Sequence, residues 1–371
     1  MIKILKNSYP QAYHLLMTQN LTLPFSKKTI PLKKTHFKAI KQVVEKIYQL
    51  KTEAPYQKKI LNHLDPISQS QQDSMLMGYD FHINEDTVKL IEVNTNASAF
   101  LLANFLYQSS NENFEDSLKA LKNSFFWEWK KFKPHKKTPK IVLIDEQIKT
   151  QKMLIEFFMY KDFFKSMGWD LDILDSHDIL IDEKNFLYTT KKERIDFIYN
   201  RSTDFYFNKH PHLAKAYKHQ TCLILPQPRD YALLADKKRQ IDWTQQTFPQ
   251  IQSIQKYLLK TKSLTKENNT LFWKNRKNYF FKISQGYSGK LVYRGSSVTR
   301  KKWEQLLKNK SLAQEYFPPS YLIDSSKQKW KIDIRAYAYK NQIQQLIARI
   351  YQGQLTNFKV KGSGFAKIKI I

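Results

Sequence analysis

The chain has 371 residues, enough for two domains or for one large domain with insertions. Hydrophobic residues make up 42% of it and aromatic residues 14%, which excludes a globally disordered chain, because disordered chains lack the apolar surface for a core. The single cysteine, Cys222, excludes an intramolecular disulfide and a cysteine-rich zinc site. No stretch approaches the length of a membrane span and the N-terminus has no apolar signal-peptide run, so we expect a soluble cytoplasmic protein with no membrane segment.

The formal net charge is +29, an excess that attracts nucleic acid, an acidic membrane surface or anionic substrates, without choosing among them. Because the basic residues are scattered along the chain, a solvated lysine-rich surface with no specific partner is the alternative. The densest basic run, residues 130–137, favours an interdomain linker.

In the first region, apolar residues three or four apart predict an amphipathic helix over 37–50. Residues 78–100 contain two β-prone runs around the polar turn at 84–86, which predicts a hairpin. Two further helical patterns follow over 101–107 and 118–129, and prolines at 134 and 139 bracket a boundary near 138. We therefore predict one unit over 1–138, N-terminal helices plus a hairpin.

Beyond it, a strand at 141–145, a helix ending near 167 and strands at 171–175 and 195–200 predict a small α/β layer with parallel strands, a unit over 139–225. The third unit, 226–371, should hold a helix around 232–243, a strand at 278–284 and strands at 333–339 and 345–351, and should end in the turn-rich segment 356–366.

The glycines are concentrated near the C-terminus, since six of the eight lie after residue 285. The run Gln285-Gly286-Tyr287-Ser288-Gly289 follows a predicted strand that carries Lys282. Glycines let main-chain amides approach an anion closely, so this run is either a phosphate-covering loop or an ordinary hairpin with glycine turns.

The hairpin is a candidate metal site. Alternation places Glu92 and Asn94 on one face, opposite Ile91 and Val93, and carboxylate and amide oxygens are the ligands that Mg²⁺ prefers. Asp80 joins them if the loop has odd length and points away if the length is even. A solvated hairpin face is the alternative.

Arginines provide the third candidate group. Asp333 and Arg335 share a predicted strand, Arg349 lies on the next one, and Asn357 and Lys361 follow in the final loop. Such arginines can clamp phosphate or carboxylate, or can form surface ion pairs. Arg201, at a strand end in YNRSTDF, is likewise either an anion-binding or a structural residue.

Taken in order, YDFHINEDTVKLIEVNTNASAF, DFIYNRSTDFYF, LADKK, NYFFKISQGYSGKLVYRG and AQEYF resemble the ATP-grasp ligases, from about residue 75 onward. The metal-type segment IEVN precedes the glycine-rich loop, so the chain resembles the circularly permuted members, such as eukaryotic-type glutathione synthetases and related carboxylate-amine ligases. The resemblance implies an α/β (α+β) fold, namely a circularly permuted ATP-grasp fold with a small Rossmann-like pre-ATP-grasp domain.

The resemblance also implies roles and cofactors, ATP and Mg²⁺. The metal ligands would be Glu92 and Asn94, with Asp80 as a further candidate. Nucleotide contacts would come from Lys237, Lys282, Ser288, Gly289, the hinge Gln314, Glu315, Tyr316 and Phe317, the ribose-binding Asp333, and Lys361. Arg335, Arg349 and Asn357 would stabilise the transferred phosphoryl group, and Arg201 would hold the substrate carboxylate.

Two departures from the family pattern bear on the substrate. Gly286 stands where glutathione synthetases carry a metal-binding glutamate, and Gly78 where they carry an arginine before the hairpin aspartate. The peptide-binding site of those synthetases is therefore not preserved, and the identity of both substrates stays open. We expect an ATP- and Mg²⁺-dependent ligase that joins a small carboxylate and a small amine through an acyl phosphate, with a homodimer as a family expectation. The alternative is a non-catalytic ATP-grasp-derived protein that binds nucleotide or an acidic polymer such as RNA.

Overall fold

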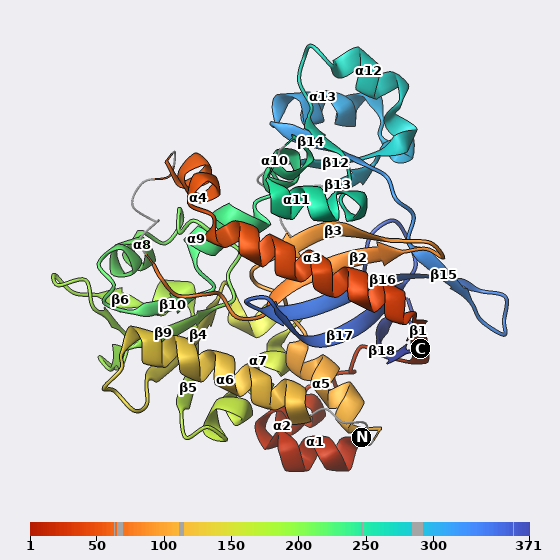
Figure 1. The fold of residues 1–371 in the computed structure, drawn as a ribbon. Helices are drawn as coiled ribbons and strands as arrows, with labels where there is room; N and C mark the ends of the chain where they lie inside the picture. The colour runs from red at the N-terminus through yellow and green to blue at the C-terminus, as the bar shows by residue number, and fades with distance from the viewer. Residues whose placement is uncertain (63, 65–69, 111–114, 246–247, 284–291, 359) are drawn as a thin grey trace.

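The structure is a computed structural model that describes residues 1–371 except 63, 65–69, 111–114, 246–247, 284–291 and 359. Its described strands form four sheets (Figure 1). The largest has the order β1-β18-β17-β16-β2-β3, with β15 pairing β16 outside this path. Its strands are β1 (Phe25–Leu32), β2 (Met77–Ile83), β3 (Val88–Asn94), β15 (Ser320–Ile323), β16 (Lys329–Tyr339), β17 (Gln342–Tyr351) and β18 (Gly364–Ile370).

Three smaller sheets complete the set. The parallel sheet has the order β10-β9-β4-β5, from β4 (Lys140–Asp145), β5 (Asp170–Asp175), β9 (Phe197–Asn200) and β10 (Leu223–Leu225). The antiparallel sheet has the order β11-β14-β12-β13, from β11 (Thr261–Ser263), β12 (Tyr279–Ile283), β13 (Val292–Arg294) and β14 (Ser311–Glu315). A meander joins β6 (Leu180–Ile181), β7 (Leu187–Tyr188) and β8 (Arg194–Ile195).

The helices follow the predicted pattern in the first half of the chain. The first seven are α1 (Ile2–Ser8), α2 (Pro10–Thr18), α3 (Lys34–Thr52), α4 (Ala54–Leu61), α5 (Phe100–Gln108), α6 (Glu115–Phe132) and α7 (Leu154–Lys165). The next are α8 (Pro211–Lys218), α9 (Pro228–Asp230), α10 (Arg239–Gln245), α11 (Pro249–Ile254), α12 (Asn269–Lys274) and α13 (Arg300–Lys308). Short turns of helix are η1 (Ile148–Thr150), η2 (Ser176–Asp178), η3 (Tyr231–Ala235), η4 (Gln255–Tyr257), η5 (Arg276–Asn278) and η6 (Gly295–Ser297).

The large sheet is buried on one face by α3, whose apolar stripe includes Ile40, Val44 and Ile47, all 0% exposed. Figure 1 shows α3 running across this sheet. On the opposite face, Phe100 of α5 packs against Tyr337 of β16. This helix covers only part of that face. The rest of it carries the polar residues of β2, β3, β16 and β17, and this uncovered part positions the candidate site.

The predicted helix, hairpin and parallel α/β layer are confirmed. One expectation is wrong. The helix expected around 232–243 is interrupted at 236–238, between η3 and α10, where the Asp236 side chain accepts hydrogen bonds from the Lys238 amide and the Tyr206 hydroxyl. The described residues of 356–363 form turns and irregular structure, as expected, whereas 364–366 begin β18, which lies between β1 and β17. The domain boundaries stay a proposal; β4 begins at Lys140 and β10 ends at Leu225.

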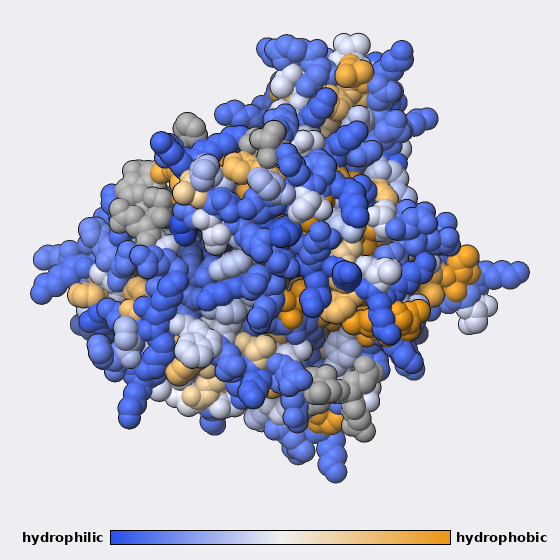
Figure 2. All heavy atoms as spheres, viewed as in Figure 1, coloured by the Kyte–Doolittle hydropathy of each residue, from blue (hydrophilic) through white to orange (hydrophobic). Residues whose placement is uncertain are grey.

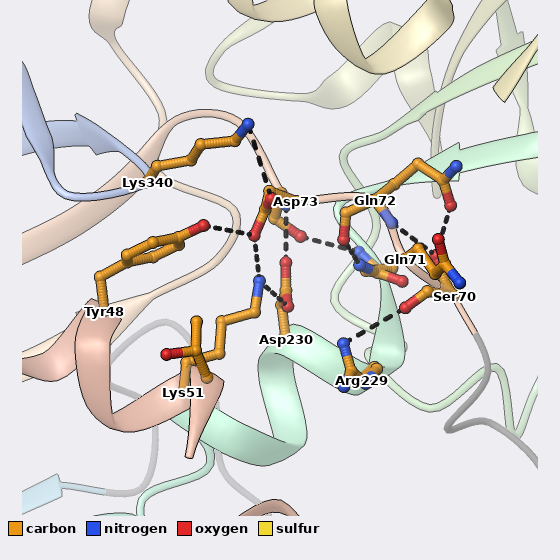
Figure 3. Close-up of polar contacts among 12 residues, drawn as sticks. Tyr48, Lys51, Ser70, Gln71, Gln72, Asp73, Arg229, Asp230 and Lys340 are labelled. Atoms are coloured by element: carbon orange, nitrogen blue, oxygen red, sulfur yellow. Dashed lines mark hydrogen bonds and ion pairs between the residues drawn. The ribbon is translucent and has the colours of Figure 1, made fainter. Parts of the chain in front are cut away.

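A buried ionic cluster, which we call the Lys51 cluster, joins parts of the chain that are distant in sequence (Figure 3). The Lys51 ammonium of α3 pairs with Asp73, just before the hairpin, and with Asp230 of α9 at 2.6 Å. The main-chain N–H of Asp73 donates to Glu128 of α6 at 3.0 Å, and Tyr339, at the end of β16, donates to the same carboxylate. The segment that enters β2 is therefore fixed by groups from α3, α6, α9 and the large sheet.

Within the described residues, no helix is both long and apolar enough to span a bilayer.

Candidate active site

The hairpin places Asp80, Glu92 and Asn94 on one face through a β-bulge. Ile83 pairs with Val88 across an even-length turn, a register that would set Asp80 opposite Ile91. The register shifts after Asp80, however, and Asp80 lies opposite Glu92 while Ile91 is the extra residue. Val93 is buried on the opposite face as predicted, whereas Ile91 is only half-buried. The bulge therefore turns Glu92 and Asn94 to the uncovered face of the sheet.

The bulged residue also forms the contact with the small antiparallel sheet. The Ile91 carbonyl accepts hydrogen bonds from the Lys282 ammonium of β12 at 3.2 Å, the Gln240 amide of α10 at 2.7 Å and the Gln314 amide of β14 at 3.4 Å. Gln314 donates further to Gln240 at 2.5 Å. The Ile91 carbonyl therefore joins the strand that carries Glu92 to α10 and to the strands β12 and β14, which carry residues of the expected nucleotide site.

Two lysines lie close enough to Glu92 to interact with it electrostatically. Lys282 is 4% exposed, and burial lowers its pKa to about 8 against the attraction of Glu92. Burial also lowers the pKa of Lys237, again opposed by Glu92, and the Lys237 ammonium donates to the Ile283 carbonyl at 3.4 Å. A buried ammonium with few anions around it is stabilised by an added anion, which suits a phosphate-binding role.

A row of alternating charges crosses β2, β16 and β17. Arg335 donates two hydrogen bonds to Asp80, at 2.7 and 2.8 Å, and Arg349 contacts Asp80 at 3.0 Å. Arg349 also donates to Asp333, its cross-strand partner, at 2.5 Å, and Thr356 donates to the other oxygen of Asp333 at 2.6 Å. Burial alone would raise the pKa of Asp80, but the two arginines outweigh it and hold that pKa well below its usual range.

The three predicted metal ligands share a face of the hairpin, but their hydrogen-bond partners differ. Both oxygens of Asp80 are engaged by arginines, so the structure places Asp80 as an anchor for Arg335 and Arg349. Glu92 accepts from the Asn94 amide at 3.3 Å. No cluster of three or more His, Cys, Asp or Glu able to hold a metal is found in the described part of the chain. The donor set that remains, one carboxylate and one amide oxygen, fits Mg²⁺, which is commonly held by one or two carboxylates together with substrate phosphates and water.

The expected adenine hinge begins with the last two residues of β14, Gln314 and Glu315, and continues into the segment after it. The Glu315 amide donates to the Lys260 carbonyl and the Tyr316 amide to the Asn278 carbonyl, both at 2.8 Å, and the Phe317 carbonyl lies 2.8 Å from a ring nitrogen of His82. The Arg294 guanidinium stacks 3.3 Å above the Tyr316 ring. These contacts fix the course of the hinge between the antiparallel sheet and the hairpin.

Three further predicted residues lie apart from the charge row. Arg201 follows β9 and donates to Asn96 and, at 3.4 Å, to the Ala97 carbonyl, both in the loop after β3. Its buried Nε has no hydrogen-bond partner among the described residues, so an incoming carboxylate would satisfy it.

Asn357 donates to the Gln352 and Leu355 carbonyls of its own loop, at 3.0 Å each, and Lys361 is exposed. Ser288 and Gly289, like Gly286, lie outside the described residues.

A narrow gap, too small to admit a water molecule, lies between the loop after β3 and the loop after β9. It is lined by Thr95, Asn96, Asn200, Ser202, Phe205, Pro226 and Gln227. A separate pocket of about 200 Å³ lies beside β5 and contains none of the predicted site residues.

Three contributors were missed at the sequence level. Gln240 lies in the first turn of α10, just after the interruption that contains Lys237, and no motif in the sequence indicated it. Thr356 precedes Asn357 and carries the contact of the final loop to Asp333. The Ile91 carbonyl had no sequence signal, because any residue supplies a main-chain oxygen.

No family model and no curated protein matches the sequence. Solved structures do match the fold. A glutathione synthetase-like effector from Globodera pallida, in its apo form, matches over 100% of this chain and 98% of its own, with a TM-score of 0.59 and 12% identity. A putative gamma-glutamylcysteine synthetase from Methylobacillus flagellatus matches over 92% of this chain and 87% of its own, with a TM-score of 0.50 and 9% identity. The chain therefore shares its fold, over its full length, with a glutathione synthetase-like protein.

Proposed function

We propose that the protein is an ATP- and Mg²⁺-dependent carboxylate-amine ligase of circularly permuted ATP-grasp type. The observation that carries the proposal is the coupling of Glu92, Lys237 and Lys282 where the hairpin meets the antiparallel sheet, beside the arginines of β16 and β17. The permutation is supported by strand order, since β2 and β3 precede the nucleotide-side elements in the chain but pair beside β16 in the sheet.

In this proposal the substrate carboxylate attacks the γ-phosphate of ATP, ADP leaves, and the acyl phosphate is then attacked by an amine to give an amide and phosphate. Lys237 and Lys282 hold the phosphates, and the Arg335 and Arg349 guanidiniums face the charge that develops on the transferred group. Asp80 and Asp333 fix both guanidiniums beforehand, so little reorganisation is needed during transfer. Mg²⁺, held through Glu92 and Asn94, would neutralise phosphate charge.

Arg201 would bind the carboxylate substrate, supported by its buried and unsatisfied Nε. Gly78 supports a substrate different from that of glutathione synthetases: a Cβ there would lie 2.6 Å from the Ala97 Cβ, so the arginine expected from the family pattern cannot be accommodated.

The test is thermal unfolding with and without ATP and Mg²⁺, because a ligand at 100 times its dissociation constant stabilises the native state by about 2.7 kcal/mol. We expect a Mg²⁺-dependent rise in Tm that Glu92→Gln abolishes and Glu85→Gln, in the exposed turn of the same hairpin, retains. ADP release that requires both a carboxylate and an amine would then distinguish a ligase from a nucleotide-binding protein without ligase activity. An unchanged Tm in the wild-type protein, or an unchanged response in Glu92→Gln, would contradict the assigned nucleotide site.

A further inference from the structure

The outer face of α6 exposes two aromatic rings. The Phe126 side chain is 39% exposed and that of Trp127 is 59% exposed, with ring centroids 5.7 Å apart. The opposite face of the same helix is fully buried, at Leu121, Phe125 and Trp129. The aromatic pair therefore lies outside the core, and burial in the fold does not account for it.

Lysines surround this pair. The segment 119–137 contains seven lysines and one carboxylate, Glu128, which is buried and accepts a hydrogen bond from Tyr339. Lys130 lies 5.9 Å from the centroid of the Phe126 ring. Lys131 and Lys136 are held by the Gln71 carbonyl and by Asp196.

No acidic partner is found, among the described residues, for the remaining lysines of this segment. They are Lys119, Lys122, Lys133 and Lys137. We call the outer side chains of 119–137 the α6 surface. Figure 1 shows α6 on the near side of the molecule, and Figure 2 shows that the same side is mostly hydrophilic with scattered apolar groups.

The positive charge of the α6 surface indicates which kind of partner it binds. A second copy of the chain would bring lysines against lysines, so the partner is an anion. A bilayer is disfavoured, because interfacial helices insert a broad apolar face and here that face is turned into the core, at Leu121, Phe125 and Trp129. A single-stranded nucleic acid offers both required features, phosphates for lysines and unpaired bases for aromatic rings. We propose that the α6 surface binds single-stranded nucleic acid, with Trp127 and Phe126 stacking on bases and lysines contacting phosphates.

The experiment measures the anisotropy of a labelled single-stranded oligonucleotide over a series of salt concentrations. Trp127→Ala changes no charge and should weaken binding roughly tenfold, since loss of one stacked base corresponds to about 1–3 kcal/mol. Leu271→Ala, at an equally exposed apolar residue on α12, is the matched control and should bind as the wild type does.

A second pair of variants tests the lysines. Replacing Lys133 and Lys137 by Gln should lower the slope of log affinity against log salt by about 1.4, because each phosphate that a lysine neutralises contributes about 0.7 to that slope for a single strand. The same change of charge at Lys301 and Lys308, exposed on α13, should leave the slope unchanged.

Equal binding by wild type and Trp127→Ala, or equal binding of a duplex of the same sequence, would overturn the proposal and leave only non-specific attraction by net charge. Binding to phosphatidylserine vesicles with no binding to the oligonucleotide would also overturn it, in favour of a membrane surface. Glu92→Gln should bind the oligonucleotide normally, so failure of the nucleotide site and failure of the α6 surface are separable.

Discussion

Replacing Lys51 by Met should strongly destabilise the protein. The Lys51 side chain is 6% exposed and lies between Asp73, 11% exposed, and Asp230, 1% exposed. Removing the shared cation leaves two buried carboxylates facing each other, with buried Glu128 bonded to the Asp73 main chain. Breaking a buried ion pair from one side costs about 3–5 kcal/mol, and we expect a loss in that range.

The measurement is urea unfolding at neutral pH, followed by tryptophan fluorescence and far-UV circular dichroism. A triple variant that adds Asp73→Asn and Asp230→Asn removes the uncompensated charges and should recover more than half of the loss, because an uncharged network of similar shape is tolerated. The carboxamide oxygen introduced by Asp230→Asn could still accept from the Ser74 amide, as the Asp230 carboxylate does at 2.6 Å.

A Lys51→Met variant that loses less than about 1 kcal/mol, or a triple variant no better than the single one, would refute this explanation of the Lys51 cluster.

Three other predictions follow from the structure. Lys282, with a pKa lowered to about 8 by burial, must be protonated to attract phosphate, so ATP affinity measured by calorimetry should fall as pH rises above about 8, and Lys282→Met should lack this dependence. Gly295→Ala places a Cβ 1.7 Å from the Arg276 carbonyl and should cost about 3 kcal/mol or more in unfolding free energy, whereas Gly168→Ala, with open space but a φ of +72°, should cost about 1 kcal/mol; equal losses would count against the clash. Asp333→Asn leaves Arg349 with Asp80 as its one carboxylate partner among the described residues, and should weaken ATP binding without unfolding the protein, as Tm and calorimetry together would reveal.

Local patterns predicted the first half of the fold well, since the spacing of Ile40, Val43 and Ile47 directly reflects which face of α3 is buried. The hairpin register could not be predicted in the same way. The even length of the turn would by itself place Asp80 opposite Ile91. The bulge places Asp80 opposite Glu92 instead, and it is fixed by contacts of the Ile91 carbonyl with Lys282, Gln240 and Gln314. Those partners lie more than a hundred residues away in the chain.

The residue types of the site were predictable, but their pairing was not. In a sequence, a carboxylate in a hairpin is equally consistent with a metal ligand and with the partner of an arginine. Arg335 contacts Asp80 because β2 lies beside β16 in the sheet, and that strand order is not visible in the sequence. The C-terminal strand was missed for a similar reason. β18 is stabilised by its neighbours β1 and β17, and its sequence begins with glycine and alternates lysine with apolar residues near its end.

The position of the hairpin in the large sheet has a consequence for folding during synthesis. β2 and β3 leave the ribosome before residues 95–328, so their partner β16 does not yet exist. Their apolar face need not wait, because α3 precedes them in the chain and packs on Tyr79 and Phe81. The other face carries Asp80 and Glu92, charges that disfavour pairing with a wrong strand. The residues assigned to nucleotide chemistry would thus also protect a nascent sheet edge until the C-terminal strands arrive.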